Sequence, residues 1–85
     1  MTNPEIRRIP IRRAKDLDAL DDAELLEGYL DGHDGEPEPG NNRSFSYWHG
    51  WRNGAVDGGH REKDDAQAEL ARDVIATGYL KWPAS

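Results

Sequence analysis

The sequence predicts an all-α fold, a small domain of two to three helices packed through glycine faces, with a flexible basic N-terminal arm. Glycines recur every four residues at Gly28 and Gly32 and again at Gly50, Gly54 and Gly58, which places each set on one face of a helix. Each glycine costs about 1 kcal/mol relative to alanine inside a helix, so we expect another backbone to approach closely. A third segment, residues 64–79, carries apolar residues at the spacing of one helix face.

Length and composition predict one small domain, expected over residues 16–82. The 85 residues are 35% hydrophobic and 33% charged, so three Trp and three Tyr must supply much of the buried surface. The absence of Cys excludes disulfides and thiolate zinc sites and fits a reducing cytosol. The sequence contains no long apolar run of the kind that would indicate a signal peptide or a membrane span. The expected compartment is the cytoplasm of a bacterium, or of a phage-infected one.

Residues 1–15 are predicted to form the flexible basic arm, because Pro4 and Pro10 interrupt them and no helical period is present. Their basic side chains are Arg7, Arg8, Arg12, Arg13 and Lys15, and the segment has a net charge of +4. Residues 16–39 hold ten carboxylates and no Lys or Arg, and the whole chain has a net charge of −6. The arm can reach a phosphate backbone or lie against the acidic segment of its own chain, and both alternatives stay open.

The first helix is predicted over residues 21–32. Asp21 is a suitable N-cap, and Glu24 three residues later completes a capping-box pattern. Leu20 and Leu25 stand where a hydrophobic staple would pair. The expected apolar stripe consists of Leu25, Leu26, Tyr29 and Leu30.

Residues 34–43 are rich in Pro, Gly and Asn and are predicted to form a loop. Ser44 then caps a second helix over residues 44–58. The aromatic side chains lie on two adjacent sides of this helix. One side has Phe45, Trp48 and Arg52, and the other has Tyr47, Trp51 and Gly54.

A third helix is predicted over residues 64–79, starting at Asp64 or Asp65. Its amphipathic stripe consists of Ala66, Leu70, Ala71, Val74, Ile75 and Tyr79. We expect this helix to fold back over the aromatic side chains of the second helix. The alternative is a self-association surface, which would produce a homodimer.

Two motifs on the first and second helices carry a resemblance to a known family. They read Gly28-Tyr29-x-x-Gly32-x-x-Gly35 and Arg43-Ser44-x-x-x-Trp48-x-Gly50-Trp51-Arg52-x-x-x-x-Asp57. Over roughly residues 25–58 the chain resembles the ribosome modulation factor family. The resemblance implies two helices joined by a linker, and binding to the small ribosomal subunit that favours dimerised, inactive ribosomes. Members with that activity are strongly basic, whereas this chain is acidic.

The aromatic and arginine side chains of the second helix admit two interpretations. In the first, they form a surface on which unpaired bases stack and whose arginines contact phosphates. In the second, most of the rings are buried in the core. The small size of the domain favours the second interpretation for most of the rings. Arg52 is expected to be exposed. The predicted RNA- or partner-binding residues are Arg43, Tyr47, Trp48, Trp51 and Arg52, together with Arg7, Arg8, Arg12 and Arg13 of the arm.

No catalytic, metal or cofactor site is predicted. His33 stands among carboxylates, but their spacing matches no calcium loop, and no two His are three or four residues apart. Ser46 and His49 are expected to point outward from one helix without an orienting third group. We therefore expect no enzyme activity.

The sequence thus predicts a non-enzymatic regulatory protein that resembles ribosome modulation factors and has the ribosome or its RNA as partner. The alternative is an acidic module that binds a basic protein surface through carboxylates on the outer face of the first helix. Those carboxylates are Asp18, Asp21, Asp22, Glu24 and Glu27.

Overall fold

The computed structural model describes residues 9–78 and contains four helical elements in that range. A 3₁₀ helix, η1 (Ala14–Ala19), leads into three α-helices, which are α1 (Asp22–His33), α2 (Phe45–Asp57) and α3 (Asp65–Thr77). The described part of the chain has no strand, which confirms the predicted all-α class. None of the helices among residues 9–78 is long and apolar enough to cross a bilayer.

Each α-helix begins where N-cap chemistry predicts. The capping side chains are Asp21, Ser44 and Asp64, and each accepts a hydrogen bond from the backbone N–H three residues later. At α3 the capping box is complete, because the Gln67 side chain also accepts the backbone N–H of Asp64. A glycine with positive φ, the conformation that commonly ends a helix, follows each of the three: Gly35, Gly59 and Gly78.

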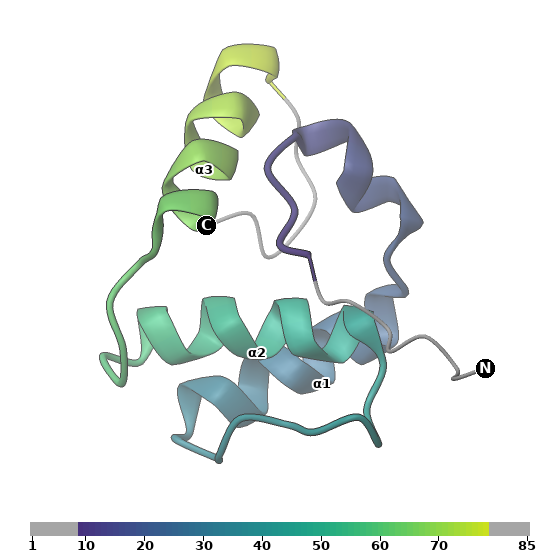
Figure 1. Ribbon diagram of the computed structural model, residues 1–85, viewed down its shortest axis with the longest axis vertical. Coiled ribbons are helices and arrows are strands. Elements are labelled where there is room, and N and C mark those ends of the chain that lie inside the picture. The colour runs from purple at the N-terminus through teal and green to yellow at the C-terminus, as the bar shows by residue number, and fades with distance from the viewer. Residues whose placement is uncertain (1–8, 79–85) are drawn as a thin grey trace, which may run out of the picture.

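The helices α1 and α2 lie side by side and run in the same direction (Figure 1). Leu25 lies against Gly50 at one end of the pair, and His33 lies against Gly58 at the other. Residue numbers therefore increase in the same direction along both helices, so the pair is parallel. A short turn cannot join parallel neighbours, so residues 34–44 carry the chain back along the length of α1 (Figure 1).

Four glycines form the interface between α1 and α2, which confirms the predicted packing through glycine faces. They are Gly28 and Gly32 of α1 and Gly50 and Gly54 of α2, all buried. A Cβ atom added at any of the four would collide with a backbone carbonyl oxygen of the other helix. The two backbones are thus in direct contact, and this contact compensates for the low helix propensity of glycine.

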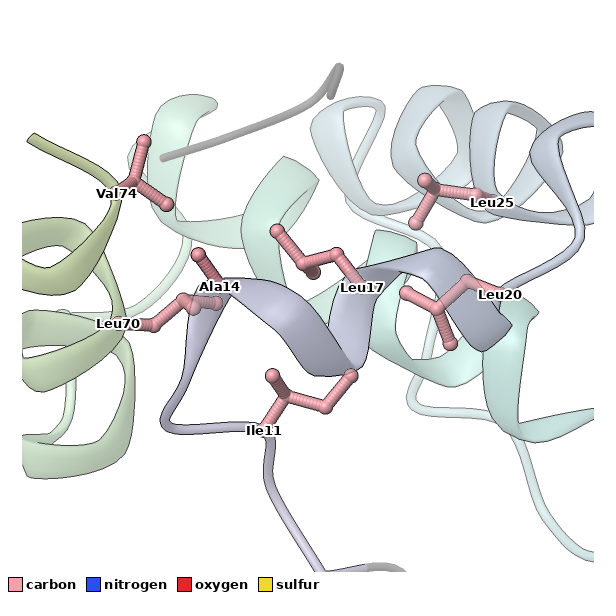
Figure 2. Packing of buried hydrophobic residues seen from close by; sticks show 7 residues of the cluster. All are labelled: Ile11, Ala14, Leu17, Leu20, Leu25, Leu70 and Val74. Atoms are coloured by element: carbon pink, nitrogen blue, oxygen red, sulfur yellow. The ribbon is translucent and has the colours of Figure 1, made fainter. Parts of the chain in front are cut away.

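The main hydrophobic cluster joins η1 to α3 and to the start of α1 (Figure 2). Leu17 of η1 and Leu70 of α3 are almost completely buried in it. Ile11 and Ala14, from the segment predicted to be an arm, are buried in the same cluster. Residues 11–15 therefore pack onto the folded domain. The remaining members are Leu20, Leu25 and Val74, and Phe45 packs against the cluster.

The predicted apolar stripe of α1 is wrong for two of its four residues. Leu26 and Leu30 are 43% and 53% exposed. The buried residues of α1 are instead Leu25, Gly28 and Gly32. The glycines determine which face turns inward, because only that face allows the backbone of α2 to approach.

The position of α3 also differs from the prediction. Its Leu70 and Val74 pack on η1 (Figure 2), whereas Tyr47 and Trp51 of α2 form a separate cluster with Ala55. The predicted cover of these two rings by α3 is therefore wrong. Ile75, expected in the buried stripe of α3, is 80% exposed, and Tyr79 lies outside the described residues.

Candidate functional site

Four of the predicted binding residues lie on α2, namely Tyr47, Trp48, Trp51 and Arg52. This helix is buried continuously from Ser46 to Ala55. Tyr47, Trp48 and Trp51 are all buried. The α1 backbone covers one side of this helix, and the loop of residues 34–44 and the start of α3 contribute further contacts. The rings are therefore core side chains, which is the second of the two interpretations that the sequence allowed.

The polar edges of these rings bind the acidic segment that wraps around them. Trp51 Nε1 donates to the backbone oxygen of Glu36 at 2.8 Å, and Trp48 Nε1 donates to Glu38 Oε2 at 3.0 Å. The Tyr47 hydroxyl donates to a carboxylate oxygen of Asp31. Burial, followed by this hydrogen bond, raises the pKa of Tyr47 to about 12. The rings thus fix the returning loop on α2.

Arg52, expected to be exposed, is buried with 4% of its surface accessible, so that prediction is wrong. Its guanidinium forms an ion pair with Asp64, the N-cap of α3, and lies 4.8 Å from the centre of the Trp48 ring. Burial, and then the charge of Arg61, lower the pKa of Arg52. Arg52 therefore links α2 to the N-cap of α3 and does not project toward solvent.

A buried chain of polar side chains continues this junction. Gln67 Nε2 donates to Asn53 Oδ1 at 3.1 Å, and Asn53 Nδ2 lies 3.3 Å from His49 Nε2. His49 Nε2 then accepts a hydrogen bond from the Asn53 amide, which requires a neutral imidazole with its proton on Nδ1. Burial, and then the positive charge of Arg52, lower the pKa of His49 to about 4.

Ser46 and His49 do not point outward as predicted, because both are buried. Ser46 Oγ accepts the backbone N–H of Asp21 at 2.8 Å, while His49 faces Asn53. The hydroxyl therefore joins the start of α1 to α2. Ser46 thus contacts the start of α1, whereas His49 belongs to the polar chain that reaches Gln67 of α3.

The other predicted binding arginines that the structure describes lie in two separate places. Arg43 lies over the Tyr47 ring at 3.8 Å and pairs with Glu27 at 2.9 Å. Arg12 and Arg13 both pair with Glu69 of α3, at 2.9 and 2.8 Å, so they contact α3 and not the acidic α1. Arg7 and Arg8 lie outside the described residues.

No group of three or more potential metal-ligating side chains exists among residues 9–78. Of the carboxylates beside His33 in the sequence, Asp31 accepts a hydrogen bond from the Tyr47 hydroxyl. Neither the contacts of the acidic loop with the rings of α2 nor the link between Asn53 and Gln67 was predicted from the sequence. The available signal was the Asp64-to-Gln67 capping pattern, because it fixes Gln67 on the first turn of α3.

Comparisons with protein-family models, with curated proteins and with solved structures each gave no match to this chain.

Proposed function

We propose that the protein is a small, non-enzymatic cytoplasmic regulator of translation that binds the ribosome and contacts its RNA through the basic segment leading into η1. One observation carries this assignment. The side chains of Arg12 and Arg13 are 50% and 56% exposed and share a single carboxylate, that of Glu69. Lys15 is exposed in the same segment. Such a group of cations attracts a phosphate backbone without regard to sequence.

The resemblance to ribosome modulation factors supports the choice of partner. The glycines that carry the resemblance pack α1 against α2, and Trp51 holds the loop of residues 34–44 through the Glu36 backbone oxygen. Contacts with RNA are therefore assigned to exposed cations and not to Trp48 or Arg52. The acidic side of the molecule, α1 and the loop after it, would face away from the phosphates, because like charges repel.

The experiment is co-sedimentation of the protein with bacterial ribosomes over a series of salt concentrations. We expect stoichiometric binding that weakens with salt, together with an increase in paired ribosomes. The variant Arg12→Gln/Arg13→Gln should bind more weakly to every RNA sequence. The slope of log K against log salt should fall by about 0.7 to 0.9 for each phosphate that the variant no longer neutralises.

A matched control removes the same charge elsewhere. Lys63→Gln/Arg72→Gln changes two exposed cations outside the segment and should leave both affinity and salt slope unchanged. Protein that stays in the supernatant at low salt would refute ribosome binding. Unchanged affinity and slope in the Arg12→Gln/Arg13→Gln variant would refute the assignment to this segment.

The second candidate function is binding of a basic protein surface by the acidic side of the molecule. It is favoured by the two exposed leucines, Leu26 and Leu30, which lie on the acidic helix α1. A protein that fails to sediment with ribosomes at low salt would direct attention to this surface.

A further inference from the structure

The outer face of α1 carries an apolar pair that lies outside the core of the fold. Leu26 and Leu30 are four residues apart and thus neighbours on one stripe of the helix. They are 43% and 53% exposed, whereas Leu25, Gly28 and Gly32 form the buried face of the same helix. Neither leucine belongs to a core cluster of the described residues.

Carboxylates surround this pair. Asp22, Glu27 and Asp34 are exposed, and the helix itself contains no Lys or Arg. Arg43, in the loop before α2, pairs with Glu27. A partner must therefore offer apolar side chains at its centre and positive charge around them.

We propose that this surface, called the α1 outer face (Leu26 and Leu30 with Asp22, Glu27 and Asp34), binds a basic amphipathic helix of another protein. A helix with two apolar side chains one turn apart can pack its ridge against the leucine stripe. Lysines or arginines beside that ridge then meet the carboxylates, which sets orientation and speeds association. The proposal rests on the second candidate function, binding of a basic protein surface, and is independent of RNA binding by residues 12–15.

Charge excludes two other occupants. Nucleic acid is repelled by the carboxylates around the leucines. A second copy of the chain that used the same face would bring two sets of carboxylates together, and like-charge juxtaposition across an interface is costly. A basic partner with a different sequence is the occupant that matches both the leucines and the charge.

The test uses the full chain labelled with ¹⁵N and a synthetic helical peptide as probe. The peptide has leucines four residues apart and lysines on both sides of them, and a scrambled peptide of the same composition is the control. We expect amide shifts confined to α1 and its neighbours. The scrambled peptide should bind at least about tenfold more weakly, because it presents the same charge without an apolar ridge.

Matched variants separate the apolar and charged contributions. Leu26→Ser/Leu30→Ser should weaken binding at least about tenfold, whereas Ile75→Ser, which removes an exposed apolar side chain from α3, should leave the affinity unchanged. Asp22→Asn/Asp34→Asn should weaken binding and reduce its salt dependence. The control Glu62→Gln/Asp65→Asn, two exposed carboxylates elsewhere, should do neither.

Thermal unfolding of each variant verifies that the domain remains folded at the binding temperature. Absence of binding by the designed peptide would overturn the proposal. It would also be overturned by equal binding of the scrambled peptide, or by wild-type affinity in the double leucine variant. Shifts centred on α3, with weaker binding by Ile75→Ser, would place the interaction on another face and overturn it too.

Discussion

The two sides of α2 are packed by opposite means. Against α1, glycines bring two backbones into direct contact, and no side chain separates them. Toward α3, an ion pair and a chain of polar side chains fill the junction, with Arg52, His49, Asn53 and Gln67 buried. The first interface depends on shape and tolerates no added atom, whereas the second depends on charge and protonation and should respond to pH.

The largest loss of stability is expected from adding one methyl group to the glycine interface between α1 and α2. Gly54→Ala places a Cβ against the carbonyl oxygen of Tyr29, and backbone cannot move aside as a flexible side chain can. We expect the free energy of unfolding to fall by about 3 kcal/mol or more, enough to unfold much of a domain this small. Chemical denaturation measures the change, and circular dichroism reports the remaining helix.

A glycine in the loop supplies the control for that variant. A Cβ at Gly40 would lie 3.6 Å from Asn42 Oδ1, an ordinary contact, so Gly40→Ala should change stability by no more than about 0.5 kcal/mol. A small change in Gly54→Ala as well would show that the two helix backbones can separate at little cost.

Acid should weaken the polar junction between α2 and α3. The pKa of His49 is lowered from 6.5 to about 4 in the folded protein, so the unfolded chain takes up the proton first. This contribution to stability is complete above pH 6.5 and is lost as the pH falls toward 4. At about 1.4 kcal/mol per unit of pKa shift, the free energy of unfolding falls by about 3 kcal/mol in total. The carboxylates of the chain add a separate pH dependence.

Denaturation at a series of pH values between about 4 and 7 measures this dependence. His49→Gln keeps a polar group near Asn53 and removes the titration, so its stability should vary less with pH over this window. His33→Gln, which replaces an exposed histidine outside this junction, is the comparison variant. Identical pH dependence in wild type and His49→Gln would contradict the assignment.

A smaller effect is expected from neutralising one partner of the ion pair. Asp64→Asn keeps an oxygen that can cap α3 and removes the negative charge beside Arg52. Because Asp64 is partly exposed, with 39% of its side chain accessible, we expect a loss of about 1–2 kcal/mol, below the roughly 3–5 kcal/mol typical of fully buried pairs. Hydrogen exchange should report faster opening at the start of α3. A uniform change over all helices would mean that the pair does not act at this junction.

The smallest effect should come from the surface contact between the basic segment and α3. Glu69→Gln removes the carboxylate that pairs with Arg12 and Arg13, two side chains that are at least half exposed. Those arginines lower the pKa of Glu69, so its contribution is present at neutral pH and disappears as acid protonates it. We expect a slight fall in melting temperature at low salt and none at about 1 M salt. A fall that persists at high salt would indicate a packing role.

The contrast also explains what could be predicted from the sequence. The caps at Asp21 and Ser44 depend on a few consecutive residues, and the glycine spacing follows from helix geometry, so both predictions are confirmed. The burial of Arg52 and His49 depends on where the start of α3 docks, a segment that follows only after the turn at Gly58. That docking left no periodic signal in the sequence.

The exposure of Leu26 and Leu30 has a similar cause. Amphipathic patterns assume that the most apolar face is buried, but a glycine face packs more closely than a leucine face and turns inward in its place. The loop posed another difficulty. Its Pro and Glu residues predict irregular structure correctly, yet they do not reveal that Glu36 and Glu38 would satisfy the indole N–H groups of α2.

The parallel direction of α1 and α2 has an electrical consequence. In an antiparallel pair the helix dipoles oppose each other, whereas here both positive ends lie together and both negative ends lie together, each equivalent to about half an elementary charge. Ser46 Oγ and the backbone of Asp21 meet at the positive end. At the negative end, His60 Nε2 donates to the backbone oxygen of His33.

Several acidic residues lie at the first of these ends, where their charge opposes the summed dipole. Asp22 and Glu24 occupy the first turn of α1, and Asp21 caps it. Part of the acidity of this chain therefore acts as a counter-charge that allows two helices to start side by side. Replacing those carboxylates with neutral residues would expose an uncompensated field at that end and favour separation of the pair.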